Sequence, residues 1–395
     1  MTTERRHDID ALRALAFTLL ILYHVGMYYV AGWPWHIKSP HEAEWLRWPM
    51  VIVNVWRMDL VFLISGVAFG FLSRGRGPMS LIGHRTVRLL LPLVFGMAVV
   101  VPYQAYAQGV ANGLVAPGFM AFMLRYWSGG PWPKGAFDGS EFPMTWNHLW
   151  YLAYLFVYTA ILALLLPVLR SPAGLQLRSA FLRLRGWRLI AVPTVPLLLF
   201  TLWLSPRFPA THDMVHDWYL HALYFTVFLY GYWMGVHEEI WLELARLRRP
   251  ALALAMACIG VYLSLRYIGI GATAPAWIAR ALRAAYLWSA IVAVLGFAHR
   301  YLNRPWPWLR WANESVYPWH MLHQTLIIMA AVALAPLRLG PVLEPVVIVF
   351  LTAAGCWALT DALIRRLRWL RPLFGLPRQA PKQASRNGST VIVGI

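Results

Sequence analysis

Cysteine is almost absent from this chain, which has only two, Cys258 and Cys356, among 395 residues. Both lie inside apolar runs, so they predict buried thiols rather than a disulfide or a metal site. Charged residues are also scarce, at 13% of the chain, and only 16 of them are acidic. This composition excludes the ordinary classes of soluble globular protein, in which about a quarter of the residues are charged.

Apolar residues dominate the chain instead. They make up 59% of it, with 22 tryptophans and a mean hydropathy of +0.54. Runs of about 20 apolar residues recur along the sequence, which is the length that a helix needs to cross a bilayer. The pattern therefore predicts an all-α, polytopic transmembrane bundle in a lipid bilayer with about ten spans. The expected spans are residues 11–31, 50–72, 87–107, 147–168, 188–205, 218–237, 250–269, 277–298, 317–335 and 342–364.

The distribution of basic residues predicts the orientation of the bundle. The formal net charge is +19, which in a soluble protein would suggest a nucleic-acid partner. Here the arginines gather in every second loop, as the positive-inside rule describes, so no nucleic-acid partner is expected and both termini are predicted to be cytoplasmic. The arginine-rich segments are residues 73–86, 170–187, 238–249, 299–316 and 365–371.

Three segments outside the spans carry separate expectations. The N-terminal Glu4-Arg5-Arg6 leads directly into the first span without a cleavable signal pattern, so that span is expected to be retained. Loop 108–146, rich in Gly, Pro and Trp, is expected to be an ordered aromatic lid or re-entrant turn on the outer side. The polar tail after Pro377 is expected to be disordered. We therefore predict a transmembrane domain over residues 1–376 and a cytoplasmic tail over 377–395.

The first span carries three ionisable residues, Asp10, Arg13 and His24. Asp10 and Arg13 are three residues apart and are therefore neighbours on one helix face. Arg13 and His24 are separated by about three helical turns, so His24 lies on nearly the same face about 16 Å further along the axis. Ionisable groups inside a bilayer usually face the bundle interior or a wet cavity. The simpler alternative is an Arg13 that snorkels to the interface and a His24 that is hydrogen-bonded between helices.

Two opposite charges, Arg57 and Asp59, lie in the outer half of span 50–72, at about the depth of His24. Because they are two residues apart they cannot face each other on a helix, so each is expected to find partners on other helices or to line a cavity. His148 opens span 147–168 on the same side and is expected to face the same outer cavity. Its alternative role is that of an interfacial residue within an aromatic belt.

At the inner side, Arg85 and Arg88 share one face at the start of the third span. They are either positive-inside anchors or ligands for the phosphates of a cytoplasmic cofactor, since arginine forks pair well with phosphate. His320 and His323 share a face of the ninth span. At the outer ends of the seventh and eighth spans, a further group of arginines either binds an acidic or sugar acceptor or snorkels. This group comprises Arg266, Arg280 and Arg283.

Several short motifs follow one another between residues 8 and 325. They are Ile9-Asp10-Ala-Leu-Arg13 followed by His24, Asp59-Leu-Val-Phe-Leu-Ile-Ser65-Gly66, Arg85-Thr-Val-Arg88-Leu-Leu-Leu-Pro92, His148-Leu-Trp-Tyr-Leu152, and Tyr317-Pro318 through His323-Gln324. Together, and in this order, they resemble the motifs of the acyltransferase-3 family of bacterial integral-membrane acyltransferases. The His148 segment is similar to the glucan succinyltransferase branch of that family. The chain departs from the family at His320, where an aromatic residue is common, and it lacks the acidic SVEEQFY-type segment of the other branch.

This resemblance implies an O-acyltransferase of the bacterial cytoplasmic (inner) membrane. Such an enzyme moves an acyl group, acetyl or succinyl, from acyl-CoA in the cytoplasm to a hydroxyl of a glycan or related acceptor at the outer face. The implied co-substrate is acetyl-CoA or succinyl-CoA, and no metal is expected. No motif specifies the acyl group, the acceptor or the oligomeric state.

The residues suit such a reaction. A sugar hydroxyl is a poor nucleophile at neutral pH, so the reaction needs a base with a pKa near 7, and histidine is the usual choice. His24 is the expected base, or alternatively a transient acyl carrier, and Asp59 is the candidate to orient it. Hydrogen-bond donors for the developing oxyanion are expected among Arg57, Ser65 and His148.

The remaining candidate residues would bind the two substrates. The span of about 16 Å from Arg13 to His24 is on the scale of a pantetheine arm, so CoA held at the cytoplasmic side would present its thioester to His24. The residues expected to hold CoA are Arg13, Arg85, Arg88 and His323, with Asp10 orienting Arg13. The residues expected to bind the acceptor are Arg57, Ser65, Arg280 and Arg283.

Two functions of other classes compete with this interpretation. A transporter or flippase of an anionic lipid or sugar would also use intramembrane charges, although no convincing pair of broken helices of the transporter type is evident. The charges in question are Arg57, Asp59, Arg280 and Arg283. A metal oxidase would use histidine pairs of ligand-like spacing, such as His212 with His216. In the predicted topology that pair and the pair in the ninth span lie on opposite faces of the membrane, which disfavours the metal oxidase.

Overall fold

The computed structural model describes residues 6–235, 237–267 and 275–378, and these ranges form a helical bundle without β-strands. Its longer helices are α1 (His7–Tyr29), α2 (Arg47–Leu72), α7 (Trp150–Leu169), α9 (Trp187–Trp203), α10 (Trp218–Met234), α11 (Glu238–Tyr267), α12 (Ala276–Leu302), α13 (Trp308–Leu334) and α14 (Gly340–Ala358). Its shorter helices are α3 (Pro78–Arg85), α4 (Leu91–Phe95), α5 (Pro102–Ala111), α6 (Phe119–Trp127), α8 (Pro172–Leu182) and α15 (Leu370–Leu373). The predicted all-α membrane fold is confirmed.

The number of helices that are long enough to cross a bilayer can be compared with the ten expected spans. Eight helical stretches in the described ranges are long and apolar enough to cross a bilayer. Two further expected spans correspond to α9 and α10, which have 17 residues each. At a rise of 1.5 Å per residue, 17 residues extend over about 26 Å, a little less than the hydrocarbon core of about 30 Å. The count of ten spans and the cytoplasmic termini therefore remain predictions.

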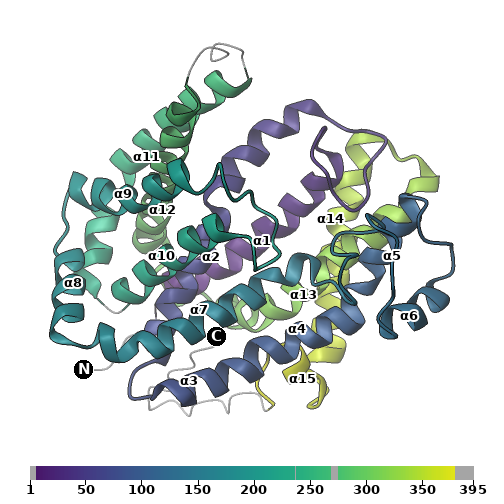
Figure 1. Cartoon of the computed structure of the whole chain (residues 1–395), viewed down its shortest axis with the longest axis horizontal. Coiled ribbons are helices and arrows are strands. Elements are labelled where there is room, and N and C mark those ends of the chain that lie inside the picture. Colours follow the sequence, from purple (N-terminus) through teal and green to yellow (C-terminus); the bar gives the residue numbers. More distant parts are fainter. Residues whose placement is uncertain (1–5, 236, 268–274, 379–395) are drawn as a thin grey trace.

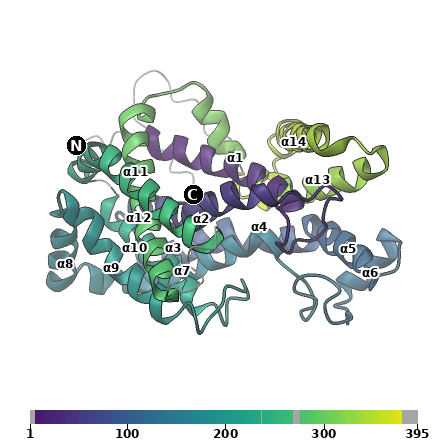
Figure 2. The same cartoon turned by 90° about the horizontal axis from the view of Figure 1, so that it is seen from above.

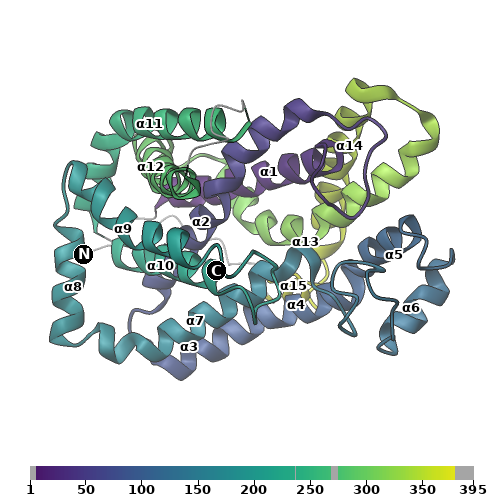
Figure 3. The same cartoon turned by 45° about the horizontal axis from the view of Figure 1, so that its top comes forward.

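The helices are arranged around α1, which contacts α2, α12, α13 and α14. Figure 1 shows α1 and α13 in the middle of an elongated bundle, with α8, α9 and α11 toward one end and α5 and α6 at the other. The view from above in Figure 2 shows the same separation of the two ends. Helices α11 and α12 form an antiparallel pair along one side (Figure 3). The first span is thus central, as its unusual charges suggested.

Glycines allow the closest helix crossing in this core. A Cβ atom on Gly66 of α2 would overlap the carbonyl oxygen of Phe228 in α10. Reciprocally, a Cβ on Gly231 of α10 would overlap the carbonyl oxygen of Leu63 in α2. Small residues at such a crossing let two backbones approach within van der Waals distance, which is a common basis of helix association in membranes. The Ser65-Gly66 motif therefore has a packing role in addition to any role in chemistry.

Prolines bend the helical stretch from α3 to α5, which also contains two π-helical segments, Thr86–Leu90 and Gly96–Val100. A proline lacks the N–H that would bond the carbonyl four residues earlier. For Pro92 that carbonyl belongs to Arg88 and accepts a hydrogen bond from the Tyr317 hydroxyl at 3.1 Å. For Pro102 it belongs to Ala98 and accepts one from the Trp127 indole at 2.9 Å. Aromatic side chains thus satisfy backbone groups that cannot bond to water in a bilayer.

The segment predicted as an aromatic lid is ordered. It contains α6, and the aromatic side chains of Phe122, Tyr126, Trp132 and Phe137 pack together there. Its role as a lid remains a prediction. Both cysteines are free and buried, as predicted. Most of the predicted C-terminal tail, residues 379–395, lies outside the described residues.

Candidate active site

Two histidines from distant parts of the chain meet at the centre of the bundle. The Nδ1 atom of His24 on α1 lies 2.9 Å from the Nε2 atom of His323 on α13. The other ring nitrogen of His323, Nδ1, lies 3.0 Å from the carbonyl oxygen of Trp319 and 2.8 Å from that of His320. Helix packing of α1 against α13 therefore brings together two of the residues predicted from the sequence.

The hydrogen bonds fix the proton positions in this pair. Carbonyl oxygens only accept, so the Nδ1 atom of His323 carries a hydrogen and donates it. In the neutral pair the Nε2 atom of His323 is then an acceptor, and the Nδ1–H of His24 donates to it. The Nε2 atom of His24 is left with its lone pair. This assignment follows from the hydrogen-bond network, and it makes His24 Nε2 the nitrogen that can accept a proton.

His148 lies next to this pair but has no free nitrogen. Its Nε2 atom is 3.1 Å from the carbonyl oxygens of both His320 and Met321, so it donates to them. Its Nδ1 atom accepts from the Gln104 amide at 3.2 Å. Both nitrogens of this buried ring are therefore used in joining α5 and α13 to the segment before α7. The structure thus brings His148 to the site, where its hydrogen bonds hold α5, α13 and the start of α7 together.

His320 differs from its two neighbouring histidines. Its ring centroid lies 5.9 Å from that of His323 and 5.7 Å from that of His148. The side chain is 4% exposed, yet neither ring nitrogen has a hydrogen-bond partner among the described residues. The sequence showed that His320 shares a face with His323, but it gave no reason to prefer it as a site residue.

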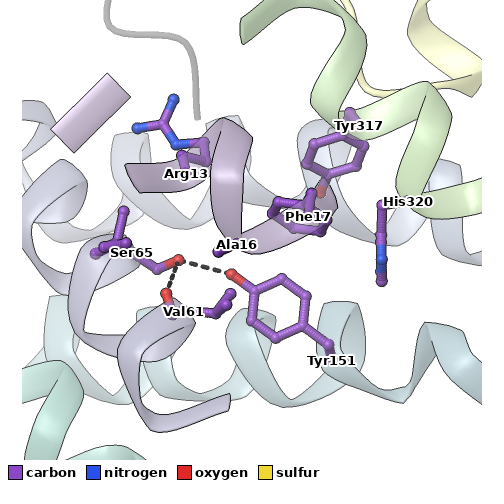
Figure 4. Close-up of a pocket in the computed structure, with 9 residues that line it drawn as sticks. Arg13, Ala16, Phe17, Val61, Ser65, Tyr151, Tyr317 and His320 are labelled. Atoms are coloured by element: carbon purple, nitrogen blue, oxygen red, sulfur yellow. Dashed lines mark hydrogen bonds between the residues drawn. The ribbon is translucent and has the colours of Figure 1, made fainter. Parts of the chain in front are cut away.

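A cavity lies between α1, α2, α7 and α13. We call it the central pocket. Figure 4 shows Arg13 and His320 on opposite sides of it. Between them, the Ser65 hydroxyl lies 2.6 Å from the Tyr151 hydroxyl and donates to the Val61 carbonyl at 2.9 Å. The lining residues are Arg13, Ala16, Phe17, Val61, Ile64, Ser65, Tyr151, Tyr317 and His320.

Positive charge gathers at the Arg13 side of the central pocket. Arg13 lies 3.9 Å from Asp10, as their spacing predicted, and 3.4 Å from the Asn313 side-chain oxygen. Arg85 is 2% exposed, and its Nε and Nη1 atoms are buried without a partner. Arg88 donates to the Gly375 carbonyl at 2.6 Å. Within the described ranges, no acidic side chain forms an ion pair with Arg85 or Arg88.

Arg57 and Asp59 lie in α2 as predicted, and they form no ion pair with each other. The Arg57 guanidinium stacks 3.5 Å above the ring of Tyr23, the residue before His24. Its Nε and Nη1 atoms are buried and have no hydrogen-bond partner in the described part of the chain, and the same holds for one oxygen of Asp59. The structure does not join Asp59 to His24, whose Nδ1 partner is His323. His323, predicted as a cofactor ligand, thus occupies the orienting position that the sequence analysis considered for Asp59.

The last two predicted binding residues, Arg280 and Arg283, lie in the first two turns of α12, which packs against α2. Both are half-buried, and neither forms a hydrogen bond or ion pair with the described residues. Two further polar residues at the site, Tyr151 and Gln104, were not predicted. Tyr151 belongs to the His148 motif, and Gln104 is one of two amides, with Gln108, in a largely apolar helix, a signal that can mark buried polar contacts.

The central pocket and the histidine pair lie inside a bundle of apolar helices. Comparison with known families identifies the class. The family described as an acyltransferase domain (Acyl_transf_3) matches residues 6–361. The chain therefore belongs to the acyltransferase-3 family, and its long apolar helices fit a multi-pass membrane protein.

Among individual relatives, the chain is similar to the glucans biosynthesis protein C of Escherichia coli. It is 26% identical over 164 residues to the protein of strain O6:K15:H31 and equally similar to that of strain K12. The match covers 40% of this chain and 38% of each relative, so it spans less than half of their length. No solved structure matches the chain.

Proposed function

We propose that this protein transfers an acyl group from cytoplasmic acyl-CoA to a hydroxyl of a glycan or related acceptor at the outer face of the bacterial inner membrane. The single observation that carries the proposal is the arrangement around the central pocket. Buried nitrogens of Arg85 that no described residue bonds lie near its Arg13 side, and His24, with a lone pair on Nε2, lies beyond its His320 side. These two features are what a phosphate-bearing donor and a hydroxyl nucleophile require.

His24 acts as the general base in this proposal. Its Nε2 atom takes the proton of the acceptor hydroxyl as the oxygen attacks the thioester carbonyl. His323 accepts the Nδ1–H bond of His24, and the backbone carbonyls behind it stabilise the positive charge that His24 gains. The new C–O bond forms, the C–S bond breaks, and the proton on His24 passes to the departing CoA sulfur. Alternatively, His24 carries the acyl group: its Nε2 forms a C–N bond as the C–S bond breaks, and the acceptor oxygen then forms the C–O bond as the C–N bond breaks, with the hydroxyl proton passing to the CoA thiolate.

The donor is held from the arginine side. Arg85 offers two buried N–H donors that no described residue uses, and Arg13 and Arg88 are close enough to interact electrostatically with it. Leaving a charged guanidinium buried and unpaired is costly, and a bidentate phosphate would satisfy it. The pantetheine arm would then run through the central pocket, past Ser65 and Tyr151, toward His24.

The outer half of α2 supplies a further cation, Arg57, close to His24. Arg57 stacks on Tyr23 next to His24 and has two buried donors that no described residue uses. In this proposal it stabilises negative charge on the acyl group, either the oxyanion of the tetrahedral intermediate or the free carboxylate of a succinyl group. Asp59, Arg280 and Arg283 face the acceptor side. Acetyl and succinyl donors remain the two candidates.

Binding of acetyl-CoA and succinyl-CoA to the detergent-purified protein, measured by calorimetry, tests the proposal directly. We expect saturable binding of at least one donor, and weaker binding in an Arg13→Ala variant. A folded protein that binds neither donor would contradict the proposal. It would favour the transporter of an anionic lipid or sugar, for which the unpaired Arg57 and Asp59 are the supporting observation. Flux of such a solute in liposomes without acyl-CoA would support that alternative.

A further inference from the structure

His320 lies in the wall of the central pocket with its hydrogen-bonding capacity unused. A neutral imidazole has one N–H donor and one lone-pair acceptor. In His320 both are buried, and neither meets a partner among the described residues. Each unsatisfied buried polar group costs free energy, whereas phenylalanine would fill the same space without that cost. The polarity of His320 is therefore unexplained by packing.

The surroundings of His320 show what kind of partner is missing. Its ring is enclosed by other rings, with centroid distances of 5.1 Å to Phe17 and 5.8 Å to Tyr151. His323 and His148 flank it on α13 and before α7, and their own nitrogens are already bonded. The remaining open side is the pocket, which His320 lines together with Arg13, on its opposite side (Figure 4). A partner must therefore enter through the pocket.

We infer that His320 binds the amide groups of the pantetheine arm of the acyl donor and so holds the thioester near His24. This inference rests on the proposed function and adds a donor-positioning residue to it. A secondary amide carries one N–H donor and one C=O acceptor, which complement the lone pair and the N–H of imidazole. Pantetheine has two such amides between its phosphate and its sulfur. His320 lies in the pocket wall across from Arg13, toward the sulfur end of the arm.

Two variants of the full-length protein test the inference. His320→Phe keeps an aromatic ring but removes both nitrogens, and His320→Gln keeps one donor and one acceptor. The donors are acetyl-CoA and the acetyl thioester of a simple thiol that lacks amides. We expect His320→Phe to raise the KM for acetyl-CoA about tenfold, the effect of losing one or two hydrogen bonds. We expect His320→Gln to recover most of that loss, and neither variant to change kcat/KM for the amide-free thioester.

The outcomes separate this inference from the proposed function. If His320→Phe slows both donors equally, or leaves acetyl-CoA unaffected, His320 does not bind the amides and the inference fails while the proposed function stands. If the wild-type protein binds no acyl-CoA, the proposed function fails first. If His320→Phe does not fold, replacing the donor amides by esters in the wild-type and His320→Gln proteins provides the second measurement. An unchanged KM for the ester-containing donor in the wild type would then overturn the inference.

Discussion

Two polar clusters adjoin the histidine pair, and they differ in how completely their hydrogen bonds are satisfied. In the first, which we call the amide network, every buried side-chain nitrogen and oxygen has a partner among the described residues. In it the Gln104 amide donates to Thr325 at 2.7 Å and accepts from Asn147 and Gln324 at 3.2 and 3.0 Å. The amide network comprises Gln104, Asn147, His148, Gln324, Thr325 and His36.

The second cluster surrounds the central pocket and its arginine side. Arg85 and His320 each have two buried nitrogens without a partner there. Buried polar groups in proteins are normally hydrogen-bonded, so the two clusters indicate different roles. A satisfied network holds helices in one arrangement, and an unsatisfied one requires a ligand to complete it. Variants in the amide network should therefore change stability, and variants around the pocket should change binding or catalysis.

The largest expected effect is at His24. His24→Ala should lower kcat by about 10³-fold, since general-base catalysis typically contributes 10²–10⁴. The melting temperature should change little, because the half-buried side chain makes a single hydrogen bond. Product formation followed by mass spectrometry checks this. His216→Ala, at an exposed histidine outside the pocket, is the control and should keep full activity. A fully active His24→Ala enzyme would refute the mechanism.

The next effect tests whether Arg85 is a ligand-binding group or a membrane anchor. Arg85→Met should weaken acyl-CoA binding by about 10- to 100-fold through loss of charge-assisted hydrogen bonds to phosphate. The same change removes an unpaired buried charge, so the melting temperature without donor should stay constant or rise. Calorimetry and thermal unfolding measure the two quantities. The control is Arg300→Met at an exposed arginine. An Arg85→Met protein that is less stable but binds acyl-CoA normally would show that Arg85 stabilises the fold and does not bind the donor.

The third prediction concerns the amide network. Gln104→Leu should lower the free energy of unfolding by about 2 kcal/mol, because the partners of one buried amide lose their bonds together. Acyl-CoA binding measured at a temperature where the protein remains folded should be unchanged. Thermal unfolding with and without acyl-CoA separates the two effects. A Gln104→Leu protein of normal stability and impaired donor binding would reverse the contrast between the clusters.

The sequence predicted much of this arrangement for a physical reason. Polar residues are rare inside a bilayer, so Arg13 and His24 could be selected on depth and helix face, whereas the family resemblance was needed to prefer His323 to His320. The partner of His24 could not be selected, because the packing of α1 against α13 depends on side-chain shapes that no spacing records. Depth alone favoured Asp59, whereas the structure joins His24 to His323. Likewise, the unused nitrogens of His320 become evident only when all of its neighbours are known.

The smallest expected effect lies outside the spans, at Asp217 just before α10. Burial alone would raise the pKa of this carboxyl group, but hydrogen bonds from Tyr154 at 2.6 Å and from Thr211 at 2.7 and 2.8 Å hold the pKa below its usual value. A lowered pKa in the folded state stabilises the protein above the unfolded pKa of about 3.9. That stabilisation is lost as the pH falls through the folded value.

Asp217→Asn should therefore reduce stability by about 1 kcal/mol at pH 7, since the amide accepts fewer hydrogen bonds than the carboxylate. The difference from wild type should shrink as the pH is lowered from 5 toward 3, where the wild-type carboxylate also begins to lose its charge. Thermal unfolding across that pH range measures it. Asp213→Asn, at a more exposed carboxylate on the same loop, should have a smaller effect. If the loss of stability in Asp217→Asn were independent of pH, the geometry of the hydrogen bonds, and not the charge of the carboxylate, would stabilise this site.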